Sequence, residues 1–350
     1  PVKKLVKILK NKLEDEAGDL DTSTRHRIEA ILKSLDRRCI AQVTGWQTML
    51  ENLTNNISTE FVDFMSVERY EGRDHDIGLH RHFIDPTKPF AENVLNQSHG
   101  AVITSATLRD QMNWDFATAR TGLNYTLGPT SQTEVPSPFN YSKQTRVFIV
   151  SDIDKNNLDQ LAAAYRELMI ASGGGALGLF TSIFRLRQIH QRLIQRPEMD
   201  KLMVLAQHVD PLDTGTLVDI FREEENSCLL GTDAVRDGID VPGQSLRLMI
   251  YDRVPWPRPT ILHKARKSYF ELEKMDLKYD DALTRLKLKQ AFGRLIRQIE
   301  DRGIFIMLDR AMPSRLNSSF PEGIEIQKLG LAETVKEVKN FLVDYYSDIC

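Results

Sequence analysis

The sequence Gln290-Ala-Phe-Gly-Arg-Leu-Ile-Arg297 stands near the end of a run, Asp280 to Glu300, whose pattern predicts one continuous helix. At about 100° per residue, one helical face collects the polar and small residues Gln290, Gly293, Arg294 and Arg297. The opposite face collects the apolar residues Ala291, Phe292, Leu295, Ile296 and Ile299. Two arginines a turn apart suit a phosphate chain, because a guanidinium is always charged and binds phosphate in a bidentate manner. An ordinary amphipathic surface helix has the same pattern, so this stretch alone leaves both interpretations open.

Other stretches of the chain decide between these interpretations. Upstream stand, in order, Val102-Ile-Thr-Ser-Ala-Thr-Leu108, Leu177-Gly-Leu-Phe-Thr-Ser182 and Gly231-Thr-Asp-Ala-Val-Arg-Asp-Gly-Ile-Asp-Val-Pro-Gly243, and Asp301-Arg-Gly-Ile-Phe-Ile-Met-Leu-Asp309 follows. Together with the arginine stretch they resemble motifs III, IV, V and VI of superfamily 2 helicases, specifically of the DinG/XPD branch. The resemblance covers most of residues 60–350.

The resemblance implies a role for each matched residue. Arg294 and Arg297 would be catalytic arginine fingers, and the nucleotide site would include Gln290, Gly293, Asp237, Gly238 and Asp240. Single-stranded DNA would contact Thr181, Ser182 and Thr232, and coupling between motor domains would involve Ser105, Ala106 and Thr107. Two points stay open. Loop hydroxyls often only cap turns, and the family often has an aromatic residue where this chain has Val235-Arg236 before Asp237, which leaves the role of Arg236 undecided.

The chain lacks the other half of an ATP site. Hydrolysis of this type needs a glycine-rich loop ending in Gly-Lys-Ser/Thr and an acidic pair for magnesium, and neither pattern occurs here. Gly173-Gly-Gly175 follows a predicted helix, whereas a phosphate loop opens one, so we assign it to a helix stop. We therefore expect ATP and Mg²⁺ to be bound mainly by an N-terminal motor half of the same protein, and this chain alone to be inactive. The start at Pro1 suggests an excised or processed piece.

The periodicity predicts an α/β fold. Apolar strands alternating with amphipathic helices indicate a RecA-like parallel sheet with helices on both faces, preceded by a mainly helical N-terminal segment. We expect a helical segment over 1–60 (the end of an arch insertion, by resemblance), the last strands of motor domain 1 over 61–122, a linker over 123–144 and motor domain 2 over 145–350. Within the second region the pattern predicts a strand at Ala101–Ile103 and another starting at Ile77.

The composition narrows the classes of protein that remain possible. With 350 residues, 41% of them hydrophobic, the chain is long enough for more than one domain, and a net charge of −3 decides neither for nor against nucleic acid. Cys39, Cys228 and Cys350 form no CxxC pair, which indicates a reducing cytoplasm and no iron–sulfur cluster in this chain. His75, His80 and His82 lack a matching ligand cluster, so we predict no metal site. No run of about 18 apolar residues occurs, so we expect no membrane partner and a cytoplasmic protein.

These observations favour the C-terminal portion of an ATP-dependent DNA helicase that translocates on single-stranded DNA. The family implies 5′-to-3′ travel and a place in DNA repair. The alternative is a truncated module that binds nucleic acid or a partner without ATPase activity. An unrelated α/β protein with chance motif matches is a third possibility.

Overall fold

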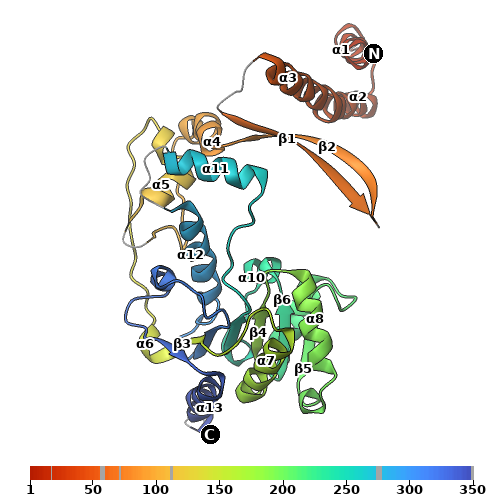
Figure 1. Cartoon of the computed structure of the whole chain (residues 1–350). Coiled ribbons are helices and arrows are strands. Elements are labelled where there is room, and N and C mark those ends of the chain that lie inside the picture. The colour runs from red at the N-terminus through yellow and green to blue at the C-terminus, as the bar shows by residue number, and fades with distance from the viewer. Residues whose placement is uncertain (17, 56–59, 71, 111–112, 273–277, 348–350) are drawn as a thin grey trace. The chain divides into compact units, whose positions relative to one another are not determined.

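The computed structural model describes residues 1–16, 18–55, 60–70, 72–110, 113–272 and 278–347 (Figure 1). The chain forms two compact units. The first comprises Pro1–Phe90 and Pro259–Tyr269, and the second comprises Ala91–Arg258 and Phe270–Cys350.

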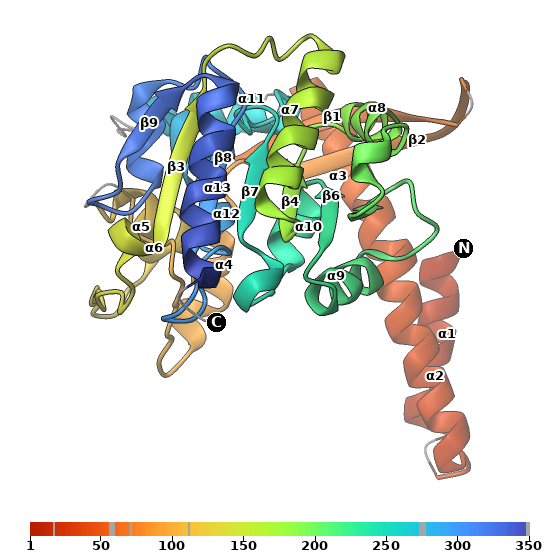
Figure 2. The ribbon, with the colours of Figure 1, turned by 90° about the horizontal axis from the view of Figure 1, so that it is seen from below.

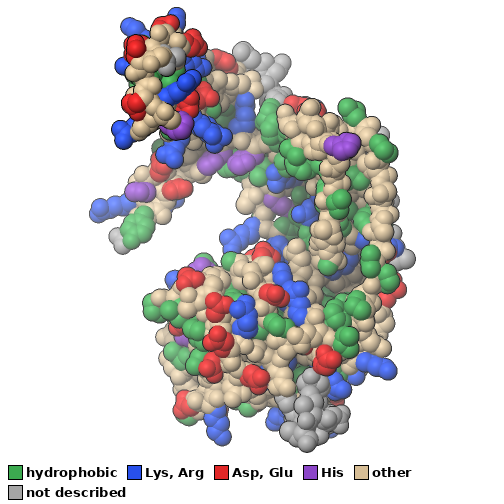
Figure 3. Space-filling view, turned by 180° about the vertical axis from the view of Figure 1, so that it is seen from behind, with side chains coloured by type: hydrophobic (Ala, Val, Ile, Leu, Met, Phe, Trp, Pro, Cys, Tyr) green, Lys and Arg blue, Asp and Glu red, His purple; other side chains and the backbone are tan. Residues whose placement is uncertain are grey.

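Helices form the start of the first unit, as the sequence predicts. They are α1 (Val2–Asp15), α2 (Thr22–Leu35), a π-helical turn (Asp36–Ile40) and α3 (Ala41–Asn55). The Asp21 side chain caps α2 by accepting a hydrogen bond from the Thr24 backbone N–H at 2.9 Å. No residue of α1 is buried. Figure 3 shows Lys and Arg side chains mixed with Asp and Glu on the helical part of the surface, which is typical of a solvated face.

A long antiparallel hairpin follows, made of β1 (Phe61–Tyr70) and β2 (Arg73–Phe83). The strand predicted to start at Ile77 starts four residues earlier, because Gly72 has φ +78° and allows a tight turn. His80 Nε2 lies 2.7 Å from Ser66 Oγ, and its ring stacks on Phe64. His80 therefore has a structural role.

The second unit is organised around a seven-stranded sheet in which every neighbouring pair is parallel. Its strands are β3 (Thr145–Val150), β4 (Ala176–Leu179), β5 (Met203–Ala206), β6 (Ser227–Gly231), β7 (Leu248–Tyr251), β8 (Gly303–Met307) and β9 (Ile326–Leu329). Their order is β5-β6-β4-β7-β8-β3-β9. The predicted α/β class is confirmed, and β9 is an additional edge strand that the sequence pattern did not indicate.

Helices cover both faces of this sheet (Figure 2). One face packs on α7 (Leu158–Ser172), α8 (Ile183–Ile194) and α13 (Leu331–Ser347), and the other on α9 (Thr214–Glu223), α10 (Asp233–Gly238) and α12 (Tyr279–Phe292). Alternate strand residues serve the two faces: Leu177 and Leu179 pack towards α12, whereas Ala176 and Phe180 pack towards α7.

The other described helices lie outside these two layers. They are α4 (Thr87–Asn93), α5 (Asp115–Thr121), α6 (Tyr141–Gln144) and α11 (Ile261–Leu272), with 3₁₀ turns at Leu95–Gln97, Leu123–Tyr125, Pro197–Met199, Gly243–Ser245 and Ser314–Ser319. The predicted helix stop at the triple glycine is confirmed. Gly173 ends α7 in the left-handed region (φ +66°), and a Cβ on Gly174 would lie 2.7 Å from the Asn226 backbone.

Two sequence predictions about local structure are wrong. The helix predicted to continue to Glu300 ends at Phe292, because the Asp301 carboxylate accepts hydrogen bonds from the backbone N–H groups of Arg297 (2.7 Å) and Gln298 (2.8 Å) and stabilises a turn instead. Ile299, assigned to the packing face, is 73% exposed as a result. The predicted strand Ala101–Ile103 is not a strand, since no described residue pairs with it, and Val102 is 92% exposed.

Candidate functional site

Three hydroxyl side chains meet at the carboxyl edge of the sheet. Thr181 and Ser182 come just after β4, and Thr232 follows β6 directly. Because β4 and β6 are adjacent parallel strands, their carboxyl ends lie side by side. We call Thr181, Ser182 and Thr232 the hydroxyl edge. The structure thus brings together all three residues predicted to contact DNA.

A buried ion pair positions the β4 side of the hydroxyl edge. Asp252, which follows β7 and is fully buried, accepts hydrogen bonds from the Thr181 backbone N–H (3.3 Å) and from Arg185 Nε (2.5 Å). Burial raises the pKa of Asp252, while the hydrogen bond from Arg185 opposes that shift. Ser182 caps α8, since its hydroxyl accepts from the Arg185 backbone N–H at 3.4 Å. No described residue hydrogen-bonds the Thr181 hydroxyl, which leaves that group available to a ligand.

Gln207 positions the β6 side. This amide is only 4% exposed, and its Oε1 accepts hydrogen bonds from both the backbone N–H (3.0 Å) and the hydroxyl (2.9 Å) of Thr232. Its Nε2 donates to Thr214 Oγ1 at 3.0 Å. The next residue, His208, has φ +64°, which is uncommon for a residue with a side chain. The Ser182 hydroxyl thus caps a helix, and the Thr232 hydroxyl is anchored to Gln207, so part of the role of each hydroxyl is structural.

The sequence analysis did not single out these supporting residues. Asp252 comes directly after the buried strand β7, Gln207 comes directly after β5, whose last two residues are buried, and Arg185 lies one turn into the helix that Ser182 caps. A polar residue placed where a buried parallel strand ends is a signal that was present in the sequence.

A second group lies where α12 ends. We call Gly293–Arg297 the arginine turn. Arg294 Nη2 donates to the Asp237 carbonyl at 3.1 Å, although the two residues are 57 positions apart. Arg297 Nε lies 3.4 Å from Asp240 Oδ1. Burial, followed by the charge of Arg297, lowers the pKa of Arg294.

The remaining predicted nucleotide residues surround this turn. Gly238 and Gly293 are exposed, and Gln290 is half-buried with a side chain that hydrogen-bonds no described residue. Arg236 is 4% exposed and pairs with Asp233 (2.7 Å) and Asp237 (2.8 Å). Its role is therefore to hold the two ends of α10 together.

The three residues predicted to couple motor domains lie in a loop. Ser105 Oγ and Thr107 Oγ1 are 3.2 Å apart, and the Thr107 backbone N–H donates to Ser105 Oγ at 3.2 Å. Ser105 and Ala106 are exposed, and Thr107 is half-buried.

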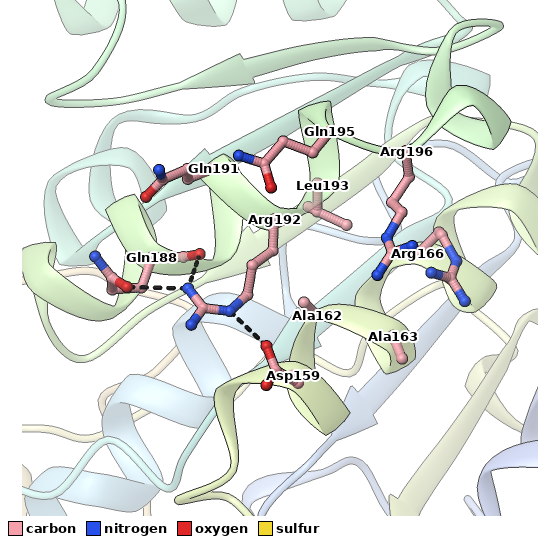
Figure 4. Close-up of a pocket in the computed structure, with 10 residues that line it drawn as sticks. All are labelled: Asp159, Ala162, Ala163, Arg166, Gln188, Gln191, Arg192, Leu193, Gln195 and Arg196. Atoms are coloured by element: carbon pink, nitrogen blue, oxygen red, sulfur yellow. Dashed lines mark hydrogen bonds and ion pairs between the residues drawn. The ribbon is translucent and has the colours of Figure 1, made fainter.

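A pocket of about 430 Å³ lies between α7 and α8 (Figure 4). Arg166, Arg192 and Arg196 line it, and Arg192 pairs with Asp159 at 2.8 Å. No predicted site residue contributes to this pocket, and its helices cover the sheet face opposite to α12. It is thus separate from both residue groups.

The described ranges hold neither a membrane-spanning helix nor a cluster of metal-binding side chains. Among these residues no helix has the length and apolar character to cross a membrane. Within the same ranges no three His, Cys, Asp or Glu side chains gather as a metal-binding group.

Comparisons with known proteins agree with the family resemblance. Residues 165–326 match the family described as "Helicase C-terminal domain". The ATP-dependent helicase DinG of Mycobacterium tuberculosis is 32% identical over 227 residues, which are 63% of this chain and 33% of that protein. The ATP-dependent DNA helicase YoaA of Escherichia coli is 30% identical over 67% of this chain and 38% of its own length. This chain therefore spans about a third of the length of these curated relatives.

A solved structure of S. tokodaii Xpd4 is 14% identical, with a TM-score of 0.41, over 92% of this chain and 70% of that one. The resemblance to the DinG branch that the motifs indicated is confirmed by the family match and by the two curated relatives.

Proposed function

Residues 165–326 match the helicase C-terminal domain family, and from this premise we propose that the chain is the C-terminal part of an ATP-dependent DNA helicase that moves along single-stranded DNA. The observation that supports this most is the meeting of Arg294 and Arg297 with Asp237 and Asp240 across 57 positions of sequence. The hydroxyl edge forms a second, separate group. A motor that converts nucleotide hydrolysis into movement needs two such sites.

At the arginine turn, the two guanidiniums suit the γ-phosphate of ATP. When bound, ATP supplies the phosphoanhydride bond that is hydrolysed. Arg294 donates to one backbone carbonyl, and Arg297 pairs with Asp240, whose side chain is 72% exposed. Both arginines can exchange these weak partners for phosphate oxygens and stabilise the charge of the transition state. An N-terminal motor half would contribute the phosphate-binding loop and the Mg²⁺ ligands, since the described residues gather none.

At the hydroxyl edge, Thr181, Ser182 and Thr232 suit the DNA backbone. Hydroxyls and strand-end N–H groups bind phosphate and sugar oxygens without reading bases, as a translocating protein requires. We propose that cleft closure on ATP moves the strand across these residues, in the 5′-to-3′ direction that the family resemblance implies.

The proposed organisation keeps the boundaries predicted from sequence. Residues 1–60 would be the end of the arch insertion, 61–122 the last part of motor domain 1 and 123–144 the linker, and 145–350 would be motor domain 2. The chain alone would then bind DNA but not hydrolyse ATP.

Fluorescence anisotropy with labelled single-stranded and double-stranded DNA, over a series of salt concentrations, tests the DNA part of the proposal. We expect preferential binding of the single strand that weakens as salt rises, because phosphate contacts release counterions. Thr181→Val should weaken binding, whereas the matched control Thr133→Val, in an exposed loop, should not. Equal binding of both DNA forms, or equal affinities of the two variants, would contradict the assignment.

A second candidate function is a binding module that never hydrolyses ATP. The completeness of the hydroxyl edge within this chain favours it, since that edge needs no further domain for its anchors. DNA-stimulated ATP hydrolysis by the intact protein would exclude this alternative, and its absence would favour it.

A further inference from the structure

An ion pair connects the loop that carries Ser105 and Thr107 to helix α12. Both Nε and Nη2 of Arg285 donate to the Asp110 carboxylate, with Nε 3.0 Å from each oxygen and Nη2 2.6 Å from Oδ2. Such two-nitrogen contacts fix the relative orientation of the two groups as well as their distance. Asp110 follows Thr107 by three residues, so the pair holds the end of this motif directly.

Lys289 adds a second attachment one turn further along α12. Its Nζ donates to the Arg109 carbonyl at 2.9 Å and lies 3.7 Å from Asp110 Oδ1. Burial lowers the pKa of Lys289, and the charge of Asp110 opposes that shift. Arg285 and Lys289 are four residues apart, so they present the same face of the helix to the loop.

This contact is buried, unlike most ion pairs on the molecule. Asp110 is 7% exposed and Arg285 is 4% exposed. A buried pair is weak evidence for stability, because desolvation offsets the attraction, yet it is specific in geometry. Such a pair therefore positions the two segments more than it stabilises the fold.

Helix α12 links this contact rigidly to the arginine turn. Arg285 precedes Gly293 by eight residues, which corresponds to about 12 Å of helix. Leu288, Ala291 and Phe292 of the same segment pack in the sheet core. A displacement of the helix at Arg285 must therefore also move its end at Gly293.

We propose that Asp110, Arg285 and Lys289 form a strut that couples the Ser105–Thr107 loop to the arginine turn. The strut residues act as positioning residues: they are not among the residues proposed to contact nucleotide or DNA, and they keep Arg294 and Arg297 in register with the loop. This inference rests on the proposed function and adds a specific route by which DNA binding regulates hydrolysis.

The test uses the intact helicase and compares basal with DNA-stimulated ATP hydrolysis. Arg285→Lys keeps the charge but loses the two-nitrogen contact. We expect the stimulation by single-stranded DNA to fall roughly 3- to 30-fold, while the basal rate and the melting temperature change little. The matched control is Arg315→Lys, because Arg315 makes an ion pair of 2.6 Å with Asp281 on the same helix but connects it to the 3₁₀ turn Ser314–Ser319 and not to the loop. The control should keep its stimulation.

A double variant guards against simple misfolding. Exchanging the charges with Asp110→Arg and Arg285→Asp should restore a large part of the stimulation that Arg285→Asp alone removes. Unchanged stimulation in Arg285→Lys, or equal loss in the Arg315→Lys control, would overturn the strut. A wild-type protein without DNA-dependent ATP hydrolysis would overturn the proposed function together with the strut, so the two failures are distinguishable.

Discussion

The hydroxyl edge and the arginine turn are both made from polar side chains next to the same sheet, but they are held differently. In the hydroxyl edge, the buried side chains of Asp252 and Gln207 accept hydrogen bonds from the backbone N–H groups of Thr181 and Thr232, respectively. In the arginine turn the backbone is fixed by Asp301, whereas the guanidiniums contact a carbonyl and an exposed carboxylate. The hydroxyl edge is held by buried side chains, which fix the backbone of Thr181 and both the backbone and the hydroxyl of Thr232, whereas the arginine turn is held only through its backbone.

This difference fits what each site would bind. A DNA strand that moves stepwise along the protein needs a binding surface that is the same after every step, so binding groups held in fixed positions are an advantage. A finger that acts only in the transition state must leave its resting contacts when the nucleotide arrives. The contrast between buried anchors and exchangeable partners leads to the predictions below.

The largest expected effect is at Arg294. Arg294→Ala in the intact helicase should lower ATP turnover by roughly 10³- to 10⁵-fold, because the arginine finger contributes that much to phosphoryl transfer. Single-stranded DNA binding should be unchanged, since Arg294 is not one of the residues of the hydroxyl edge. The control is Arg196→Ala, in the pocket between α7 and α8. Near-normal turnover by a folded Arg294→Ala protein would contradict the finger role.

The next effect is at Asp252. Asp252→Ala leaves Arg185 buried without its carboxylate, so the free energy of unfolding should fall by about 3–5 kcal/mol. Asp240→Ala removes the exposed partner of Arg297 and should change the free energy of unfolding by less than about 1 kcal/mol. Urea unfolding of this chain measures both. Equal losses for the two variants would mean that the two sites are held alike after all.

A smaller effect is expected at Gln207. Gln207→Leu keeps the volume but leaves the Thr232 N–H and hydroxyl without their acceptor, which should lower the free energy of unfolding by roughly 1–3 kcal/mol. Affinity for single-stranded DNA should fall as well, because Thr232 loses its fixed position. The control Gln132→Leu, in an exposed loop, should stay within about 0.5 kcal/mol. A stability loss with full DNA affinity would separate the anchor from the proposed binding role.

The smallest effect concerns His190 on α8, the helix that starts at Ser182. Burial lowers the pKa of His190, with Asp210 opposing the shift, so folding favours the neutral ring. The neutral His190 ring therefore stabilises the fold fully above the unfolded pKa of about 6.5, and this stabilisation is lost as the pH falls through the lower pKa of the folded state. The urea midpoint should therefore fall slightly between about pH 7 and 5. His190→Gln should flatten this dependence, and the exposed control His26→Gln should keep it; an equal slope in both variants would exclude His190 as the source.

The sequence located most of the strands and helices of the second unit because their periods are strong. Buried parallel strands are predicted from short apolar runs, such as Gly303–Leu308, which contains the observed β8 (Gly303–Met307). It failed where local pattern and tertiary contact disagree. The apolar run Ala101–Ile103 resembles a strand, yet a strand exists only with a hydrogen-bonded neighbour.

The residues of both sites were nameable from sequence, because they stand in ordered motifs at fixed spacing. The residues that hold these site residues in position could not be named from the sequence. Asp252, Gln207 and Asp110 act through partners that are 71, 25 and 175 positions away, and no local period signals such a pairing.

The sequence by itself thus determined the fold class, the order of the motifs and the identity of the candidate residues, since short-range hydrophobic periodicity and motif spacing carry that information. Only the tertiary structure decided that α12 ends at Phe292, that Thr181 and Thr232 share one edge, and that Arg285 joins Asp110. Each of these three facts depends on which distant residue pairs with a buried charge or accepts a hydrogen bond from a backbone N–H. Such partners come together only when the whole sheet packs.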